Sequence, residues 1–218
     1  MFERPLTRKA WLGSAAVAAL GLAGLDARES DAAAVSCILT PEQTEGPYYI
    51  AGEKLRRNIT DGRGGAPMQL RTFAVDATTC RPIKNAAVDV WHADAAGVYS
   101  GFGSGVSSRT FMRGVQRTNA KGLAEFRTVY PGWYQGRTVH IHVKVHVGGT
   151  VVHTGQLYFS DALTDAVYRR APYSSRPSRT TRNADDMFFR NGGSRSMLRV
   201  NRRSSGLYVA TITMGIRR

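Results

Sequence analysis

The 218-residue sequence predicts a mainly β fold, an antiparallel β-sandwich with long loops and little helix. Short stretches of alternating apolar and polar residues recur along the chain, and this alternation is the period of strands with one buried face. Turn-forming Gly, Pro, Asn and Asp residues separate the stretches. Only residues 162–170, which follow the candidate caps Ser160 and Asp161, favour a helix. The pattern therefore predicts two sheets that share one core.

The expected elements follow one another with short connections. Two prolines and a glycine exclude a long helix from residues 35–50 and favour an extended arm. Turns are expected at 119–122 and 148–149, and a loop at 171–183. The predicted strands cover residues 68–76, 86–93, 110–116, 123–129, 138–147 and 151–159, with two more inside 194–218. No repeat or linker divides residues 35–218, so we predict a single domain there, large enough for a full core.

The N-terminus has the composition of an export signal. Residues 1–34 begin with basic residues, continue with an apolar run and end in the small residues 32–34, which fit a cleavage site. The apolar run is too short to span a membrane. The stretch TRKAWL at 7–12 resembles a twin-arginine signal with Lys9 in place of the second arginine, and an ordinary secretory signal is the alternative. We therefore predict an exported mature domain, periplasmic or secreted, with no stable membrane span.

The cysteine count and the net charge give further expectations about the mature domain. Cys37 and Cys80 both follow the signal, so one disulfide is expected, with two reduced thiols as the alternative. The formal net charge is +14, and the signal carries as many acidic as basic residues, so the excess belongs to the mature domain. No recognition motif accompanies the scattered basic residues, so we expect a solvated basic surface and no nucleic-acid partner. The sequence leaves the oligomeric state open.

The strand expected over residues 138–147 carries the first sign of chemistry. His140 and His142 lie on one face of it, roughly 6–7 Å apart along the backbone. Two imidazoles at this spacing can bind one metal ion. A half-buried strand whose polar face is exposed to water is the alternative.

Tyrosines near the histidine pair favour iron over zinc. Tyr134 and Arg137 precede the pair after a Pro-Gly turn, and Tyr99 ends another turn-like segment. Structural zinc sites use Cys and His, and catalytic zinc sites use His with a carboxylate. Phenolate oxygen is a hard anionic donor, which suits Fe(III), an ion that lowers the phenol pKa far below its free value of about 10.

Four segments resemble one protein family, in the family's order. They are TPEQTEGPYY at 40–49, DVWHADAAGVYSGF at 89–102, PGWYQGRTVHIHVKV at 131–145 and GQLYF at 155–159. On these segments the chain resembles the intradiol ring-cleavage dioxygenases, the family of protocatechuate 3,4-dioxygenase and the catechol 1,2-dioxygenases. We expect no N-terminal helical dimerisation region of the catechol 1,2-dioxygenase kind. The chain looks closer to the protocatechuate 3,4-dioxygenase type and to small exported relatives.

The resemblance implies a catalytic iron site. One Fe(III) per chain would be bound by Tyr99, Tyr134, His140 and His142. It also implies that Tyr134 leaves the metal and acts as a base when a catechol binds, that Arg137 stabilises charge on the substrate, and that Gln156 lies near the oxygen site. The implied reaction is intradiol cleavage of a catechol-type ring by O2 to a cis,cis-muconate-type product. Residues 51–67 and 94–108 are expected to contact the ring's substituents and so to determine which catechol is accepted.

A non-catalytic binding module of the cell envelope is the alternative function. Residues 80–90, CRPIKNAAVDV, and the turn at 119–122 also resemble transthyretin-like and carboxypeptidase-regulatory-like β-sandwich domains. Such modules have no need of two tyrosines and two histidines together. Among the other histidines, we expect His92 to be packed and His153 to lie on the surface.

Overall fold

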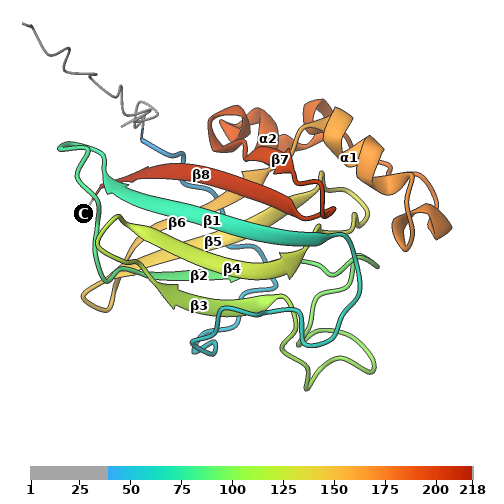
Figure 1. The fold of residues 1–218 in the computed structure, drawn as a ribbon, viewed down its shortest axis with the longest axis horizontal. Coiled ribbons are helices and arrows are strands. Elements are labelled where there is room, and N and C mark those ends of the chain that lie inside the picture. Colours follow the sequence, from blue (N-terminus) through green and yellow to red (C-terminus); the bar gives the residue numbers. More distant parts are fainter. Residues whose placement is uncertain (1–38, 218) are drawn as a thin grey trace, which may run out of the picture. The chain divides into compact units, whose positions relative to one another are not determined.

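Within the described residues, 39–217, eight strands form two four-stranded sheets that pack face to face (Figure 1). In this computed structural model, these residues belong to one compact unit, Ala34–Arg218. The first sheet has the order β4-β1-β8-β7 and the second the order β3-β2-β5-β6. The strands are β1 Pro67–Asp76, β2 Ala87–Trp91, β3 Arg113–Arg117, β4 Leu123–Val129, β5 His140–Val147, β6 Thr150–Tyr158, β7 Arg199–Arg202 and β8 Tyr208–Ile216. The predicted mainly β sandwich is confirmed.

One strand pair departs from the predicted antiparallel arrangement. β1 and β8 run parallel, with Met68 opposite Tyr208 and Asp76 opposite Ile216, whereas the other paired strands are antiparallel. An alternating pattern fixes which side chains face the core, but it carries no information on strand direction. Direction can be predicted where a short hairpin joins two strands, and a long connection separates β1 from β8.

The core lies between the sheets and takes alternate side chains from each strand. Leu70 of β1 and Phe126 of β4 meet Val90 of β2 and Val143 of β5, and all four are fully buried. Burial of each such side chain contributes on the order of 1.5–3 kcal/mol. Because neighbouring residues on a strand point in opposite directions, the intervening side chains of β2 and β5 are directed to the outer face of the second sheet.

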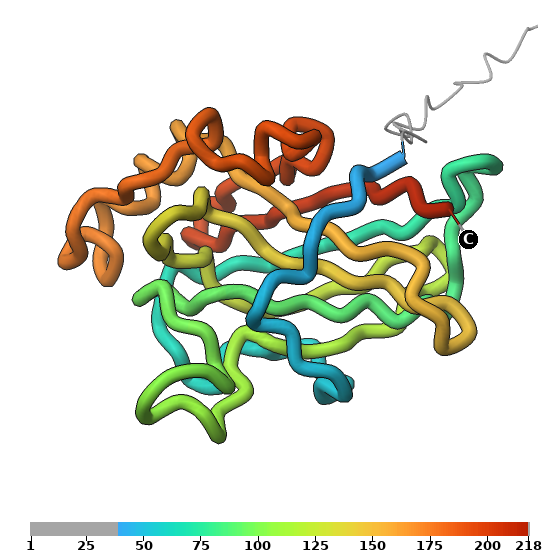
Figure 2. Tube along the Cα trace, turned by 180° about the vertical axis from the view of Figure 1, so that it is seen from behind, coloured from blue at the N-terminus to red at the C-terminus, as the bar shows by residue number. Residues whose placement is uncertain are grey.

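The N-terminal arm covers this outer face. Figure 2 shows residues 39–50, in blue, running across the strands of the second sheet. A backbone hydrogen bond of 2.9 Å ties the arm to β6, and Tyr49 of the arm packs on Trp91 of β2 with ring centroids 4.8 Å apart. Beneath the arm, His142 of β5 is 1% exposed. The alternative of a strand with a water-exposed polar face is therefore wrong for the histidine pair.

Within residues 39–217, the helices lie in the connection between β6 and β7 (Figure 1). The Ser160 hydroxyl accepts a hydrogen bond from Leu163 N and caps α1, as predicted. The expected loop 171–183 holds a 3₁₀ turn. The elements are α1 Asp161–Tyr168, α2 Met187–Arg190 and the 3₁₀ turns Tyr173–Ser175, Asn183–Asp185 and Gly193–Ser196. None of the helices in residues 39–217 is long and apolar enough to cross a membrane.

Some predictions about the N-terminus fall outside the described residues. The export signal at 1–34, its two alternative routes and the domain boundary that follows it stay predictions. Cys80 is disulfide-bonded, in agreement with the expected bridge. Its expected partner, Cys37, also lies outside the described residues.

Candidate metal centre

The histidine pair lies on the outer face of β5 with its ring nitrogens converging. His140 Nε2 and His142 Nε2 are 3.0 Å apart. His140 Nδ1 lies 2.6 Å from the Thr138 carbonyl oxygen, so Nδ1 carries the proton and Nε2 presents its lone pair. A cation held at about 2.0–2.1 Å by two nitrogens at a right angle requires a nitrogen–nitrogen distance of about 3 Å. The pair therefore has the spacing of two neighbouring ligands of one metal ion.

Two tyrosines lie against the pair, from two different loops. Tyr134 Oη is 3.2 Å from His140 Nε2. The Tyr99 ring lies 5.6 Å from the Tyr134 ring and 6.2 Å from the His142 ring, between centroids. The buried Tyr99 hydroxyl has no hydrogen-bond partner of normal geometry within residues 39–217. A buried hydroxyl in this state is costly unless another group, such as a metal ion, satisfies it.

The loop between β2 and β3 fixes Tyr99 through a turn at its start. Asp94 Oδ1 accepts hydrogen bonds from Ala96 N at 2.9 Å and Val98 N at 3.0 Å. Gly97 lies at φ +80° inside this turn, and a Cβ there would be 2.2 Å from the Trp133 carbonyl oxygen. Because only glycine permits this approach, the loop that carries Tyr99 packs directly against the segment that carries Tyr134.

Burial sets the protonation of all four side chains. It lowers the pKa of His140 to about 3, with a further contribution from the charge of Arg137, and it lowers the pKa of His142 well below its usual value. Burial raises the pKa of Tyr99 well above its usual value of 10. Burial also raises the pKa of Tyr134, although the positive charge of Arg137 partly lowers it. The histidines are therefore in their neutral, ligating form, whereas ionised tyrosines require a cation beside them.

Arg137 and Gln156 lie next to each other at this site. Arg137 Nη2 donates to Gln156 Oε1 at 2.5 Å, and Gln156 stands opposite His142 in the β5–β6 register. Gln156 Nε2 donates to the Thr44 carbonyl oxygen in the arm at 3.0 Å. The structure thus brings all six sequence-predicted site residues into one place, and their catalytic roles stay predictions.

Several neighbours of the site were missed or incompletely predicted from the sequence. Tyr48 stacks on Tyr99 with centroids 4.3 Å apart, and Trp91 stacks on His142 at 5.0 Å. Asp186, which accepts a hydrogen bond from Arg137 Nε at 2.8 Å, was not singled out from the sequence, because it lies far along the chain from Arg137.

Of the two predictions about the burial of other histidines, one is correct and one is wrong. His92 is fully buried, and its ring nitrogens form hydrogen bonds with the Ala93 carbonyl oxygen and with Thr128 Oγ1. It is therefore a packed residue, as expected. His153 was expected on the surface, and this is wrong, because it is 1% exposed. The arm accounts for its burial, since the Pro41 carbonyl lies over the neighbouring backbone of β6.

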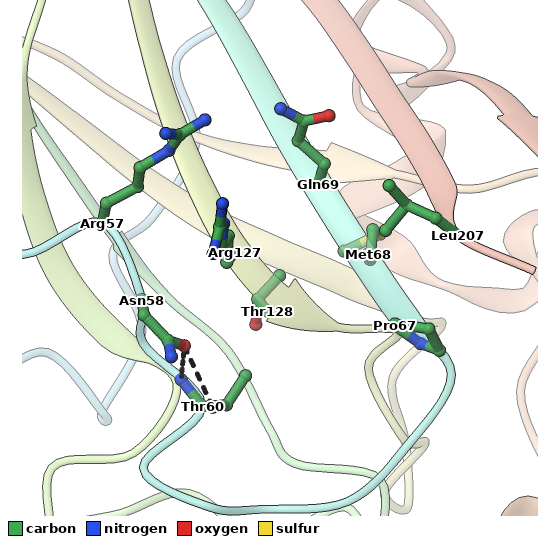
Figure 3. A pocket seen from close by; sticks show the side chains of 9 residues that line it. All are labelled: Arg57, Asn58, Thr60, Pro67, Met68, Gln69, Arg127, Thr128 and Leu207. Atoms are coloured by element: carbon green, nitrogen blue, oxygen red, sulfur yellow. Dashed lines mark hydrogen bonds between the residues drawn. The ribbon is translucent and has the colours of Figure 1, made fainter. Parts of the chain in front are cut away.

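The candidate metal centre is not formed from the common metal-binding residue types alone. Within residues 39–217, no three His, Cys, Asp or Glu side chains are grouped to hold a metal, so this centre depends on its tyrosines. A separate pocket of about 380 Å³ lies on the first sheet and contains none of the six site residues (Figure 3). It is lined by Arg57, Asn58, Thr60, Pro67, Met68, Gln69, Arg127, Thr128 and Leu207.

Comparisons with known proteins identify the family of this chain. A family model described as a dioxygenase matches residues 44–168, more than half of the chain. The intradiol ring-cleavage dioxygenase of Tetranychus urticae has a solved structure that is 34% identical, with a TM-score of 0.78 over 83% of this chain and 95% of that one.

Curated relatives match over shorter lengths. Catechol 1,2-dioxygenase 1 of Acinetobacter lwoffii is 34% identical over 44% of this chain and 32% of its own length. The chlorocatechol 1,2-dioxygenase of Cupriavidus pinatubonensis is 30% identical over 56% of each. The chain thus spans between a third and just over half of these relatives. Because the family model and the similar solved structure agree, the chain belongs to the intradiol ring-cleavage dioxygenase family.

Proposed function

We propose that the protein is a non-haem Fe(III)-dependent dioxygenase that cleaves a catechol-type ring between its hydroxyl-bearing carbons with O2, giving a cis,cis-muconate-type product. The observation that carries this proposal is the convergence of two neutral histidines, the buried Tyr99 and the half-buried Tyr134 at one point of the second sheet. We propose one iron ion per chain, held by His140, His142, Tyr99 and Tyr134.

The donor set itself supports ferric iron. Two phenolates are hard anionic ligands, and both tyrosines are buried where ionisation is unfavourable without a strongly charged cation. Fe(III) supplies that charge and, when bound, orients the catechol and makes its ring reactive toward O2. The alternative, a non-catalytic envelope module, has no use for four such side chains at one point.

The surroundings of the two tyrosines support different roles for them. Tyr99 is 5% exposed and lies under Tyr48, so it is the ligand that stays in place. Tyr134 is only half-buried and lies in the connection between β4 and β5, where it forms an isolated antiparallel bridge with Arg137. With iron bound, Tyr134 would be held as a phenolate, and its Oη would then be placed to accept a proton from a substrate hydroxyl.

The polar neighbours act on the bound substrate. Arg137 is always charged, and its planar guanidinium stabilises negative charge that develops on the ring. Gln156, fixed by the arm, holds Nη2 of that guanidinium in place. The names of the curated relatives, which act on catechol and chlorocatechol, support a catechol-type substrate.

A matched pair of histidine variants tests the proposal. His142→Ala removes a ligand, so we expect the protein to lose bound iron and at least about 100-fold in O2 consumption with catechol. His146→Ala on the same strand, beyond the irregularity at Val145/His146, serves as the control and is expected to keep both. Catechol-dependent O2 consumption and the ultraviolet absorbance of the product are measured together. Equal activity in the two variants contradicts the assigned site.

A further inference from the structure

One buried carboxylate holds the segment on which the active site depends. Asp186, the residue before α2, is 1% exposed. Its Oδ2 accepts hydrogen bonds from Arg137 Nε and from Thr138 N, both at 2.8 Å. Its Oδ1 accepts from Phe188 N at 2.8 Å and Phe189 N at 3.0 Å. Each oxygen thus has two donors, and such hydrogen bonds to an ionised group are about twice as strong as neutral ones.

The same carboxylate is linked to a predicted iron ligand through one residue. Thr138, whose N–H is fixed by Asp186, offers its carbonyl oxygen to His140 Nδ1 at 2.6 Å. The Thr138 hydroxyl donates a second hydrogen bond, of 2.6 Å, to Asn183 Oδ1. The orientation and tautomer of the histidine therefore depend on a backbone that Asp186 positions.

Arg137 is held on three sides. Asp186 binds Nε, Gln156 binds Nη2, and the Phe188 ring stacks on the guanidinium with 4.3 Å from the central carbon to the ring centroid. The Phe188 backbone is itself capped by Asp186. Nη1, which carries two N–H groups, takes no part in this set of hydrogen bonds. The set therefore fixes the plane of the guanidinium and leaves the Nη1 donors for a substrate.

We propose that Asp186 is a positioning residue of the reaction, which aims Arg137 at the substrate and orients His140 through Thr138. This inference rests on the proposed function, because the roles of Arg137 and His140 do. The carboxylate also supplies the counter-charge that a largely buried guanidinium beside a metal cation needs. It comes from the helical connection, far along the chain from the strand that it serves.

The chemistry of the carboxylate predicts the effect of replacing it. All four partners of Asp186 are donors, so an asparagine at this position must turn its NH2 group toward two of them and lose those hydrogen bonds. In Asp186→Glu the charge remains, but the oxygens move by one methylene. Asp165 is the matched control: it lies in the same helical connection and pairs with Arg179 and Arg182, away from the site.

The test compares Asp186→Asn, Asp186→Glu and Asp165→Asn with the wild type. We expect Asp186→Asn to lower kcat/KM for catechol by about 10–100-fold while iron is still bound, and Asp165→Asn to leave it unchanged. Asp186→Glu is expected to lie between the wild type and Asp186→Asn, and it carries the test if the asparagine variant does not fold. Hydrogen exchange over residues 135–140 is expected to be faster in both Asp186 variants.

Two results overturn the inference. One is a folded Asp186 variant with the kcat/KM of the wild type. The other is unchanged hydrogen exchange over residues 135–140, since a positioning role requires that segment to loosen. An iron-loaded wild-type protein that cleaves neither catechol nor a substituted catechol refutes the proposed function instead. The exchange measurement needs neither metal nor substrate, so it still decides whether Asp186 fixes the segment.

Discussion

Single buried polar groups on the outer face of the second sheet determine what this protein can do. His140 and His142 are neutral because burial lowers their pKa values. Tyr99 is protonated because burial raises its pKa. A bound Fe(III) changes this state by making ionised tyrosine favourable. The chemistry at the residue scale therefore depends on burial, which the arm and the loops provide.

Asp89 makes the stability of the fold depend on pH. This residue of β2 is 2% exposed; burial and the charge of Glu53 raise its pKa to about 7, against hydrogen bonding from Tyr49 and the charge of Lys144. Its pKa in the unfolded chain is about 3.9. The folded state therefore binds more protons between these values, and the contribution of Asp89 to stability falls as the pH rises from about 4 to about 7.

Asp89→Asn removes this titration. We expect the variant to gain about 1–3 kcal/mol in free energy of unfolding relative to the wild type between pH 5 and pH 8. Urea unfolding of both proteins at the two pH values measures the gain. The difference between the proteins is the quantity to follow, because buried histidines such as His153 titrate in the wild type and the variant alike. A difference that does not change with pH contradicts the raised pKa.

At the scale of elements, loops from separate parts of the chain meet at the site. The segment with Tyr134 follows β4, the loop with Tyr99 follows β2, and the two touch at Gly97 and Trp133. The helical connection adds Asp186, and the arm adds Tyr48.

A pair of glycine variants tests the contact between the loops. Gly97 and Gly103 both have positive φ, at +80° and +85°, but a Cβ meets the Trp133 carbonyl only at Gly97 and meets nothing within 4 Å at Gly103. We expect Gly97→Ala to be less stable than Gly103→Ala by about 1–2 kcal/mol and to bind iron less tightly. Thermal unfolding and metal content measure both effects. Equal stability of the two variants contradicts a tight contact at Gly97.

The sequence predicted individual elements better than their arrangement. Strands such as β5 and β6 were predicted because alternation reports one buried face, and α1 because Ser160 is a local cap. The parallel pairing of β1 with β8, the burial of His153 beneath the arm and the contact of Asp186 with Arg137 depend on residues far apart in the chain. No local pattern contains that information, so the structure was needed.

At the largest scale, residues 39–217 form a sandwich whose candidate site lies outside its core. The apolar core between the sheets is separate from the polar outer face of the second sheet, where the six site residues meet. This separation explains why His140 and His142 were recognisable from the sequence. They occupy positions on β5 that a plain sandwich fills with solvated residues, and the motif around them is that of the family.

The visible absorption spectrum of the wild-type protein, loaded with iron and then mixed with catechol without O2, tests the central claim most directly. Tyrosinate bound to Fe(III) absorbs visible light, so we predict a coloured protein with one iron ion per chain and a spectrum that shifts when catechol is added. A protein that stays colourless and iron-free after reconstitution with iron would contradict the account.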